Sequence, residues 1–374
     1  MPVRYITVTP LTNLFKPVER AFGDVAVVGA VDNDATGPKK RPIPVTNPDS
    51  VSDASNVAGA DRPVDSTFWF KGNLGRSVRL ALSQSPGPSK VWAVAMDAAD
   101  GVNALANALT EVSKIPVQIV VLANTALSAI GDRPPIEALA THVNSVSNTG
   151  GDGKERIGVA MLGKGVTDTA LVSGTMGINR MVMVAHRSDE DAAAAVAGAI
   201  GAYEPHISML LKPVTISQDG EFSDSEIDAF NTARINWLSD PLLLPGKGIH
   251  LGEGYTLGST QPYVDIVRTI DDISFRLKAR LIQTIGNLRI SRSGLRALDS
   301  QMAAVLQPLV DRGVIESFDT FLPILALLDK DPSSLTPAEL AQINNAQNDR
   351  VVGAMVTVDY AGAIHRLNIT LKFE

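Results

Sequence analysis

The sequence predicts a mixed fold, with an α/β part that carries a mainly parallel sheet and a final α+β part of helices and short strands. Two observations predict the α/β part. Apolar runs of strand length recur between residues 25 and 185, and helical patterns lie between them. A third observation sets the final part apart. Its apolar residues recur first at steps of three and four, over 263–285, and then at steps of two, over 366–373.

The composition is that of an ordinary globular protein, with 45% hydrophobic and 20% charged residues. A chain of 374 residues is long enough for two or three domains of roughly 150 residues. The net charge of −7 opposes binding to nucleic acid, and the absence of cysteine excludes disulfides, thiol catalysis and Cys-ligated metals. We see no membrane-spanning apolar run and no signal-peptide layout. We therefore expect a soluble protein folded in a cytoplasm, without direct membrane insertion.

The α/β part is expected over residues 25–240. The continuous apolar run at 25–31 is typical of a strand covered on both faces. Residues 32–64 are rich in Pro, Asp, Ser, Asn and Gly, which predicts a surface excursion. Further strands are expected at 91–96, 117–123, 157–162 and 180–185, with helices at 104–112, 136–146 and 189–203.

The final part, residues 241–374, begins with a connection rich in Gly and Pro. Its helix at 263–285 has one continuous apolar stripe, formed by Ile266, Ile270, Ile273, Leu277, Leu281 and Ile285. A second helix is expected to end at Gly313, and a strand follows at 314–322. Thr336, Pro337 and Glu339 form the start of a third helix, with a capping box and a proline at the first helical position.

Both chain ends have the pattern of a solitary strand, at residues 3–9 and 366–373. The second alternates without a fault, with Leu367, Ile369, Leu371 and Phe373 on one face and Arg366, Asn368, Thr370 and Lys372 on the other. A lone strand is not stable, so each must join a sheet. The terminal strand could pair with residues 351–360 of its own chain or with another subunit.

Few residues are candidates for chemistry. The five histidines, His142, His186, His206, His250 and His365, show no metal-ligand spacing, so we expect no metal site. Gly163, Lys164 and Gly165 follow the strand at 157–162, where open α/β sheets often bind ligands. A nucleotide- or metabolite-binding enzyme with its site at 163–165 is therefore the alternative interpretation. We predict no catalytic residue and no cofactor.

The last third of the chain resembles the contractile tail sheath proteins of phage tails, R-type bacteriocins and related injection systems. Four motifs in the family's order carry the resemblance: YVDIVRTIDDISFRLKARL from 263, VIESFDTFLP from 314, TPAE from 336 and YAGAIHRLNITLKF from 360. A weaker match covers VAVVGAV from 25 and the stretch from SVRLALSQ to VWAVAM at 77–96. Residues 32–64 do not align.

This resemblance implies a non-enzymatic subunit that stacks as hexameric rings into a helical tube around an inner tail tube protein. Baseplate and terminator proteins would be further partners, and nucleic acid would not. It implies an inner sheath domain made from 1–24 and 241–374, with helices and a small mixed sheet completed by neighbours' strands. The α/β part at 25–240 would be the inserted outer domain. Assembly would occur in the host cytoplasm and yield a virion tail or a contractile injection particle.

The resemblance also implies which residues meet other subunits. Strands exchanged between subunits would carry Arg4, Ile6, Val8, Leu367, Ile369, Leu371 and Phe373. Basic residues of the helix at 263–285 are candidates for contact with the inner tube or a neighbour, namely Arg268, Arg276, Lys278 and Arg280. A solvated helix face is an equally open interpretation of these four.

Overall fold

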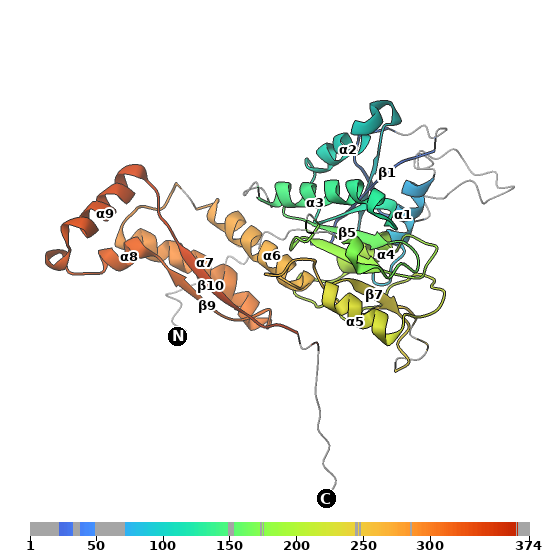
Figure 1. Ribbon diagram of the computed structural model, residues 1–374. Helices are drawn as coiled ribbons and strands as arrows, with labels where there is room; N and C mark the ends of the chain where they lie inside the picture. The colour runs from blue at the N-terminus through green and yellow to red at the C-terminus, as the bar shows by residue number, and fades with distance from the viewer. Residues whose placement is uncertain are drawn as a thin grey trace, which may run out of the picture. The chain divides into compact units, whose positions relative to one another are not determined.

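The computed structural model describes residues 22–32, 38–48, 72–148, 153–172, 174, 176–243, 246, 248–284, 286–363 and 365. These residues form two compact units that divide between Ile273 and Ser274 (Figure 1). The first, the α/β unit, contains the described residues up to Ile273 together with 361–363 and 365. The second, the ribbon unit, is Ser274–Tyr360.

The α/β unit is built on an eight-stranded sheet with the order β2-β3-β1-β4-β5-β6-β7-β8. Its six parallel strands are β1 (Val25–Gly29), β3 (Val91–Ala95), β4 (Ile119–Leu127), β5 (Ile157–Leu162), β6 (Met181–Ala185) and β7 (Asn236–Ser239). The short strands β2 (Ile43–Val45) and β8 (His250–Leu251) pair antiparallel at its two edges. The prediction of a mainly parallel sheet is confirmed.

Helices cover both faces of this sheet (Figure 1). Helices α1 (Asn73–Leu82) and α4 (Ala192–Ala202) pack on one face, and α2 (Ala104–Val112), α3 (Arg133–Asn148) and α5 (Asp224–Ala233) pack on the other. Helix α4 is Ala-rich because it is buried almost all round and lies close to α1. A Cβ added at Gly198 would come within 2.2 Å of the Ala81 carbonyl oxygen.

The expected surface excursion at 32–64 contains a short strand, which its composition did not predict. Residues 43–45 form β2, which pairs with β3 and places Pro44 opposite Trp92. Proline is tolerated there because an edge strand needs no donor on its outer side. Residues 33–37 and 49–71 lie outside the described residues. Helix α5 and strands β7 and β8 were also not expected from the sequence.

The ribbon unit contains α7 (Arg292–Asp311), β9 (Ile315–Phe321), α8 (Pro323–Leu328), α9 (Pro337–Asp349) and β10 (Met355–Tyr360). Its core is centred on Leu295, Met302 and Leu322. Gly313 follows α7 with a φ of +68°, as a C-terminal stop requires. The capping box of Thr336 and Glu339 at the start of α9 is confirmed. Four short 3₁₀ helices complete the described structure, at Ala98–Asn103, Ile130–Asp132, Thr169–Leu171 and Pro332–Ser334.

Helix α6 (Val264–Leu281) begins in the α/β unit and ends in the ribbon unit. Its first half does not bury the expected stripe. Ile270 is 42% exposed, whereas Arg268 and Asp271 are buried. Strand β8 and the start of α6 belong to the α/β unit, so the two units divide later than the boundary expected at 240/241. None of the described helices is long and apolar enough to cross a membrane.

Candidate functional site

Strands β9 and β10 form an antiparallel ribbon that has no third strand among the described residues. Its register places Phe321 opposite Met355, and Ile315 opposite Tyr360. A two-stranded ribbon is marginally stable alone, and this one is supported on one side by the core of the ribbon unit, where Val356 packs. An edge strand of this kind is a template for the addition of another strand.

The two faces of the ribbon differ in character. Val356, Val358 and Tyr360 are half-buried, and the alternate residues of β10 are exposed. The exposed face has an apolar end, where Phe321 and Met355 are 49% and 63% exposed. The residues at its other end are polar or acidic, and they include Ser317, Asp319, Thr357 and Asp359. A strand added to this ribbon would need one apolar face and one polar face.

The two edges of the larger sheet, as far as the structure describes them, are less suited to strand addition. At one edge, β2 carries Pro44, which has no N–H to donate to a further strand. At the other edge, residues 211–214 run along β8. The Val214 amide donates to the Ile249 carbonyl at 2.8 Å, and the Leu251 amide donates to the Lys212 carbonyl at 2.9 Å. Of the two sheets in the described structure, the ribbon is therefore the better candidate for strand addition.

The four basic candidates on α6 lie in different surroundings. Arg268 is only 5% exposed, and its Nη2 donates to the carbonyl oxygens of Tyr203 at 2.8 Å and Phe22 at 3.1 Å. Burial lowers the pKa of Arg268 to about 10. Its guanidinium thus binds the C-terminus of α4 within its own chain. Lys278 is exposed, and Arg276 and Arg280 are half-buried.

The residues expected in exchanged strands lie outside the described residues. These are Arg4, Ile6 and Val8 at one end of the chain and Leu367, Ile369, Leu371 and Phe373 at the other. Their role stays a prediction from the sequence.

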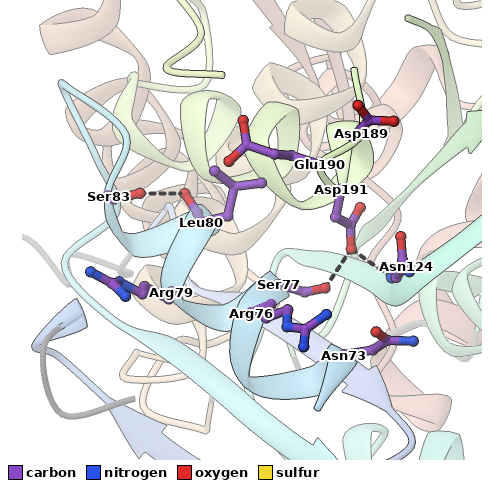
Figure 2. Close-up of a pocket in the computed structure, with 10 residues that line it drawn as sticks. All are labelled: Asn73, Arg76, Ser77, Arg79, Leu80, Ser83, Asn124, Asp189, Glu190 and Asp191. Carbon is purple, nitrogen blue, oxygen red and sulfur yellow. Dashed lines mark hydrogen bonds between the residues drawn. The ribbon is translucent and has the colours of Figure 1, made fainter. Parts of the chain in front are cut away.

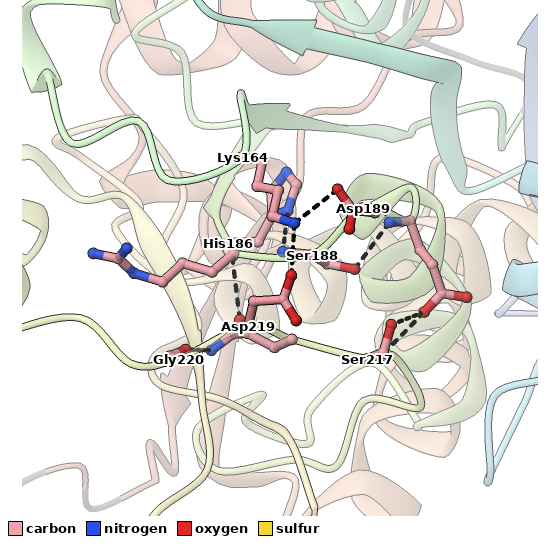
Figure 3. Close-up of polar contacts among 10 residues, drawn as sticks. Lys164, His186, Ser188, Asp189, Ser217, Asp219 and Gly220 are labelled. Carbon is pink, nitrogen blue, oxygen red and sulfur yellow. Dashed lines mark hydrogen bonds and ion pairs between the residues drawn. The ribbon is translucent and has the colours of Figure 1, made fainter.

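The alternative site at 163–165 lies at the carboxyl end of β5, and its polar groups are already paired (Figure 3). The Lys164 ammonium lies 2.7 Å from carboxylate oxygens of both Asp189 and Asp219, and these hydrogen bonds raise its pKa. The Gly163 amide donates to the Leu127 carbonyl, and the Gly165 amide donates to the His186 carbonyl. A phosphate cradle needs free backbone amides, and a nucleophilic lysine needs a lowered pKa, so this turn offers neither.

His186, beside this turn, is held as a structural histidine. Its Nε2 lies 3.0 Å from the Leu162 carbonyl oxygen, and its Nδ1 lies 3.2 Å from the Ser188 amide nitrogen. A carbonyl only accepts, so Nε2 carries the proton and Nδ1 accepts from the Ser188 amide. Burial lowers the pKa of His186, which keeps the ring neutral.

A pocket of about 470 Å³ lies between α1 and the start of α4 (Figure 2). Its floor is the buried Asp191 carboxylate, which accepts from the Ser77 hydroxyl at 2.5 Å, the Asn124 amide at 2.6 Å and the Ala194 amide at 2.9 Å. Burial raises the pKa of Asp191. These bonds cap α4 and tie it to α1 and β4, so they account for the carboxylate without a ligand.

Metal binding finds no support in the described part of the chain, where no group of three or more His, Asp or Glu side chains is placed to hold an ion. Instead, two histidines pack against charged side chains. Burial and the nearby Arg156 guanidinium lower the pKa of His142 to about 4. His365 pairs with Glu253 at 2.9 Å.

Two buried pairs were missed by sequence reasoning. Arg180 makes two parallel hydrogen bonds to the Asp271 carboxylate, at 2.7 and 2.8 Å, and the pair of His365 with Glu253 is similarly buried. The partners are 91 and 112 residues apart in the sequence. No local pattern in the sequence could have indicated them.

The structure is similar to solved structures of contractile sheaths. The sheath complex of an extracellular contractile injection system, PVC, in its contracted state matches with a TM-score of 0.65 at 12% identity, over 100% of this chain and 98% of that chain. The contracted helical sheath of the anti-feeding prophage matches with 0.64 at 12%, over 98% and 99%. A sheath tail protein from Desulfitobacterium hafniense matches with 0.55 at 11%, over 85% and 92%.

These likenesses extend over both units of the chain. No protein-family model matches the sequence, and no curated protein matches it. The chain therefore has the fold of the contractile sheath proteins, as its sequence led us to expect.

Proposed function

We propose that this chain is the structural subunit of a contractile sheath, which polymerises as stacked hexameric rings around an inner tube and contracts to drive that tube through a target envelope. The fold shared with sheath proteins of contractile injection systems supports this function. The observation that carries it is the β9–β10 ribbon, which pairs with no third strand among the described residues, whereas the larger sheet has a proline in one edge strand and residues 211–214 along the other. Strand addition takes place at an exposed sheet edge, which the ribbon offers.

Strands from the chain ends of neighbouring subunits would complete the ribbon. The apolar face of residues 366–373 would extend the half-buried face of β10, where Val356 and Val358 lie. Its basic face, with Arg366 and Lys372, would then lie on the side that carries Asp319 and Asp359. The apolar and charged patterns of donor and ribbon therefore match when the strand is added in this orientation.

Strand addition is strong enough to hold subunits together while other contacts change. Each added backbone hydrogen bond contributes about 1 kcal/mol net. Each of the four buried apolar side chains of the strand contributes roughly 1.5–3 kcal/mol. A surface salt bridge contributes about 0–1 kcal/mol. The donated strands would act as tethers, and the polar faces of the subunits would slide and repack during contraction.

The two units take different places in this proposal. We assign the ribbon unit, residues 1–20 and the terminal strand to the inner domain beside the tube, and the α/β unit to the outer domain. Of the four basic candidates on α6, Lys278, Arg276 and Arg280 keep a proposed role in contact with the tube or a neighbour, and Arg268 has a structural role. Baseplate and terminator proteins are the further partners proposed.

Contraction in this scheme requires no catalytic residue. A sheath assembled in a metastable extended state releases free energy as each subunit moves to a better-packed state. A gain of about 5.5 kcal/mol per subunit would shift an equilibrium from 1:99 to 99:1, and repetition along a tube makes the change effectively irreversible. Assembly in a host cytoplasm, followed by release as a tail or injection particle, is consistent with this scheme.

Substitution of Ile369 by proline tests the function. Proline lacks the N–H that a paired strand donates, so Ile369→Pro should leave a folded subunit that forms no tubes in negative-stain electron micrographs. Ile369→Val is the matched control, because it keeps both the N–H and an apolar side chain. Deletion of residues 366–374 should have the same effect as the proline. Tubes of normal length from the deletion would overturn strand donation.

A further inference from the structure

His365 contacts the α/β unit through both of its ring nitrogens. Its Nδ1 lies 2.9 Å from the Glu253 carboxylate, and its Nε2 lies 2.9 Å from the Ser208 hydroxyl. Its ring centroid is 4.5 Å from that of Tyr263. The side chains of His365 and Glu253 are only 11% and 6% exposed. No other residue beyond Tyr360 has such contacts in the described structure.

The surroundings of His365 are themselves fixed. Tyr263 stacks on Tyr255 at 5.4 Å, and the Tyr255 backbone amide donates to the buried Asn236 side chain at 2.6 Å. The Ser208 hydroxyl also accepts from the Leu210 amide at 3.2 Å. The histidine therefore packs into a preformed cradle of the α/β unit.

The cradle lies at the place where the chain leaves the α/β unit and later re-enters it. Tyr263 immediately precedes α6, the helix through which the chain leaves the α/β unit. His365 follows the end of β10 after only residues 361–364, where the chain has returned to that unit. The chain thus leaves and re-enters the α/β unit at two points that are in direct contact.

We propose that His365 is a clasp, which fastens the root of the C-terminal segment to the α/β unit beside the root of α6. A pull on residues 366–374 would then be carried by Glu253, Ser208 and Tyr263, and would not reach β10 through residues 361–364. The contacts of His365 that form the clasp do not depend on the proposed sheath function. The effect of the clasp on a donated strand does rest on that function. Nine residues span at most about 30 Å when extended, so the clasp also limits where a donated strand can pair.

Limited trypsin digestion of the dilute, unassembled chain tests the clasp. Trypsin cuts after Arg366, next to His365, and after Lys372, farther along the segment. A protease needs several residues on each side of the bond to be free, so the clasp should slow the cut at Arg366 more than the cut at Lys372. In His365→Ala the ratio of the two rates, Arg366 over Lys372, should rise at least threefold.

Two further variants make the outcome decisive. Glu253→Ala removes the acceptor that His365 Nδ1 meets, so it should raise the same ratio even if His365→Ala does not fold. His206→Ala is the matched control, because His206 is a half-buried histidine of the same unit that pairs with Glu204 at 3.6 Å; it should leave the ratio unchanged.

A ratio that changes less than threefold in Glu253→Ala, and in His365→Ala where that variant folds, overturns the clasp. The measurement uses unassembled protein, so failure of the wild-type chain to form tubes would count against the sheath function and leave the clasp standing.

Discussion

Truncation of Arg268 distinguishes a residue that binds a partner from one that holds its own chain together. The Arg268 guanidinium is buried and donates to the carbonyl oxygens of Tyr203, at the end of α4, and Phe22, just before β1. It therefore ties α6 to two other segments of the α/β unit. A positive charge at a helix C-terminus also interacts favourably with the helix dipole.

The magnitude follows from the groups left behind. Arg268→Ala would leave two part-buried carbonyl oxygens without these donors, at about 1–3 kcal/mol each, so we expect a loss of about 2–6 kcal/mol in the free energy of unfolding. The pKa of Arg268, about 10, stays above neutral pH, so the side chain is charged in the folded and in the unfolded chain. The loss should therefore be the same at pH 6 and pH 8.

Tryptophan fluorescence during urea unfolding provides the assay. Two of the three tryptophans, Trp92 and Trp237, lie in β3 and β7, so their emission reports on the α/β unit. Arg276→Ala is the matched control, two turns later on α6, and should shift the midpoint far less. If Arg268→Ala unfolds at the same urea concentration as the wild-type protein, Arg268 has no structural role. It would then again be a candidate for contact with a partner.

Three further predictions concern single side chains. His142 has a folded-state pKa of about 4 against 6.5 in an unfolded chain, so the unfolded chain binds more protons between these values. Stability should therefore fall as pH falls from 6.5 to 4, by at most about 3 kcal/mol, and His142→Gln should flatten that slope in urea titrations. Asp271→Ala breaks a buried bidentate pair with Arg180 and should cost about 3–5 kcal/mol, whereas a wild-type unfolding midpoint would contradict this role. Lys164→Ala removes only exposed ion pairs, so unfolding and tube formation should be unchanged, and saturable nucleotide binding lost in this variant would revive the enzyme interpretation.

The elements that the sequence predicted well have their signal in adjacent residues. Strand β5 was expected at 157–162 and is found there, because a short apolar run bounded by polar residues has few other interpretations. Helix α9 begins where Thr336 and Glu339 placed it, because a capping box acts within one turn. Hydrophobic periodicity and capping motifs involve residues that are close in the sequence. They therefore predict an element correctly where interactions between such residues determine it.

The sequence misled where the energy depends on groups far apart in the chain. The stripe of α6 predicted that Ile270 would be buried and Arg268 exposed, and the reverse is found. A buried arginine is stable only where acceptors such as carbonyl oxygens take its hydrogen bonds. The carbonyl groups of Phe22 and Tyr203 do so here, and the sequence of α6 alone cannot predict that they lie beside Arg268. The clasp at His365 was missed for the same reason, because its partner Glu253 is remote in sequence.

Blocking both edges of the eight-stranded sheet has a consequence for the subunit before it meets any partner. A long, buried, Val-rich sheet with an open edge would template the stacking of further chains in arbitrary register, which is how amyloid grows. Pro44 removes a donor on one flank, and residues 211–214 cover the other. The described edges of the largest sheet are therefore poor templates for the strands of further chains.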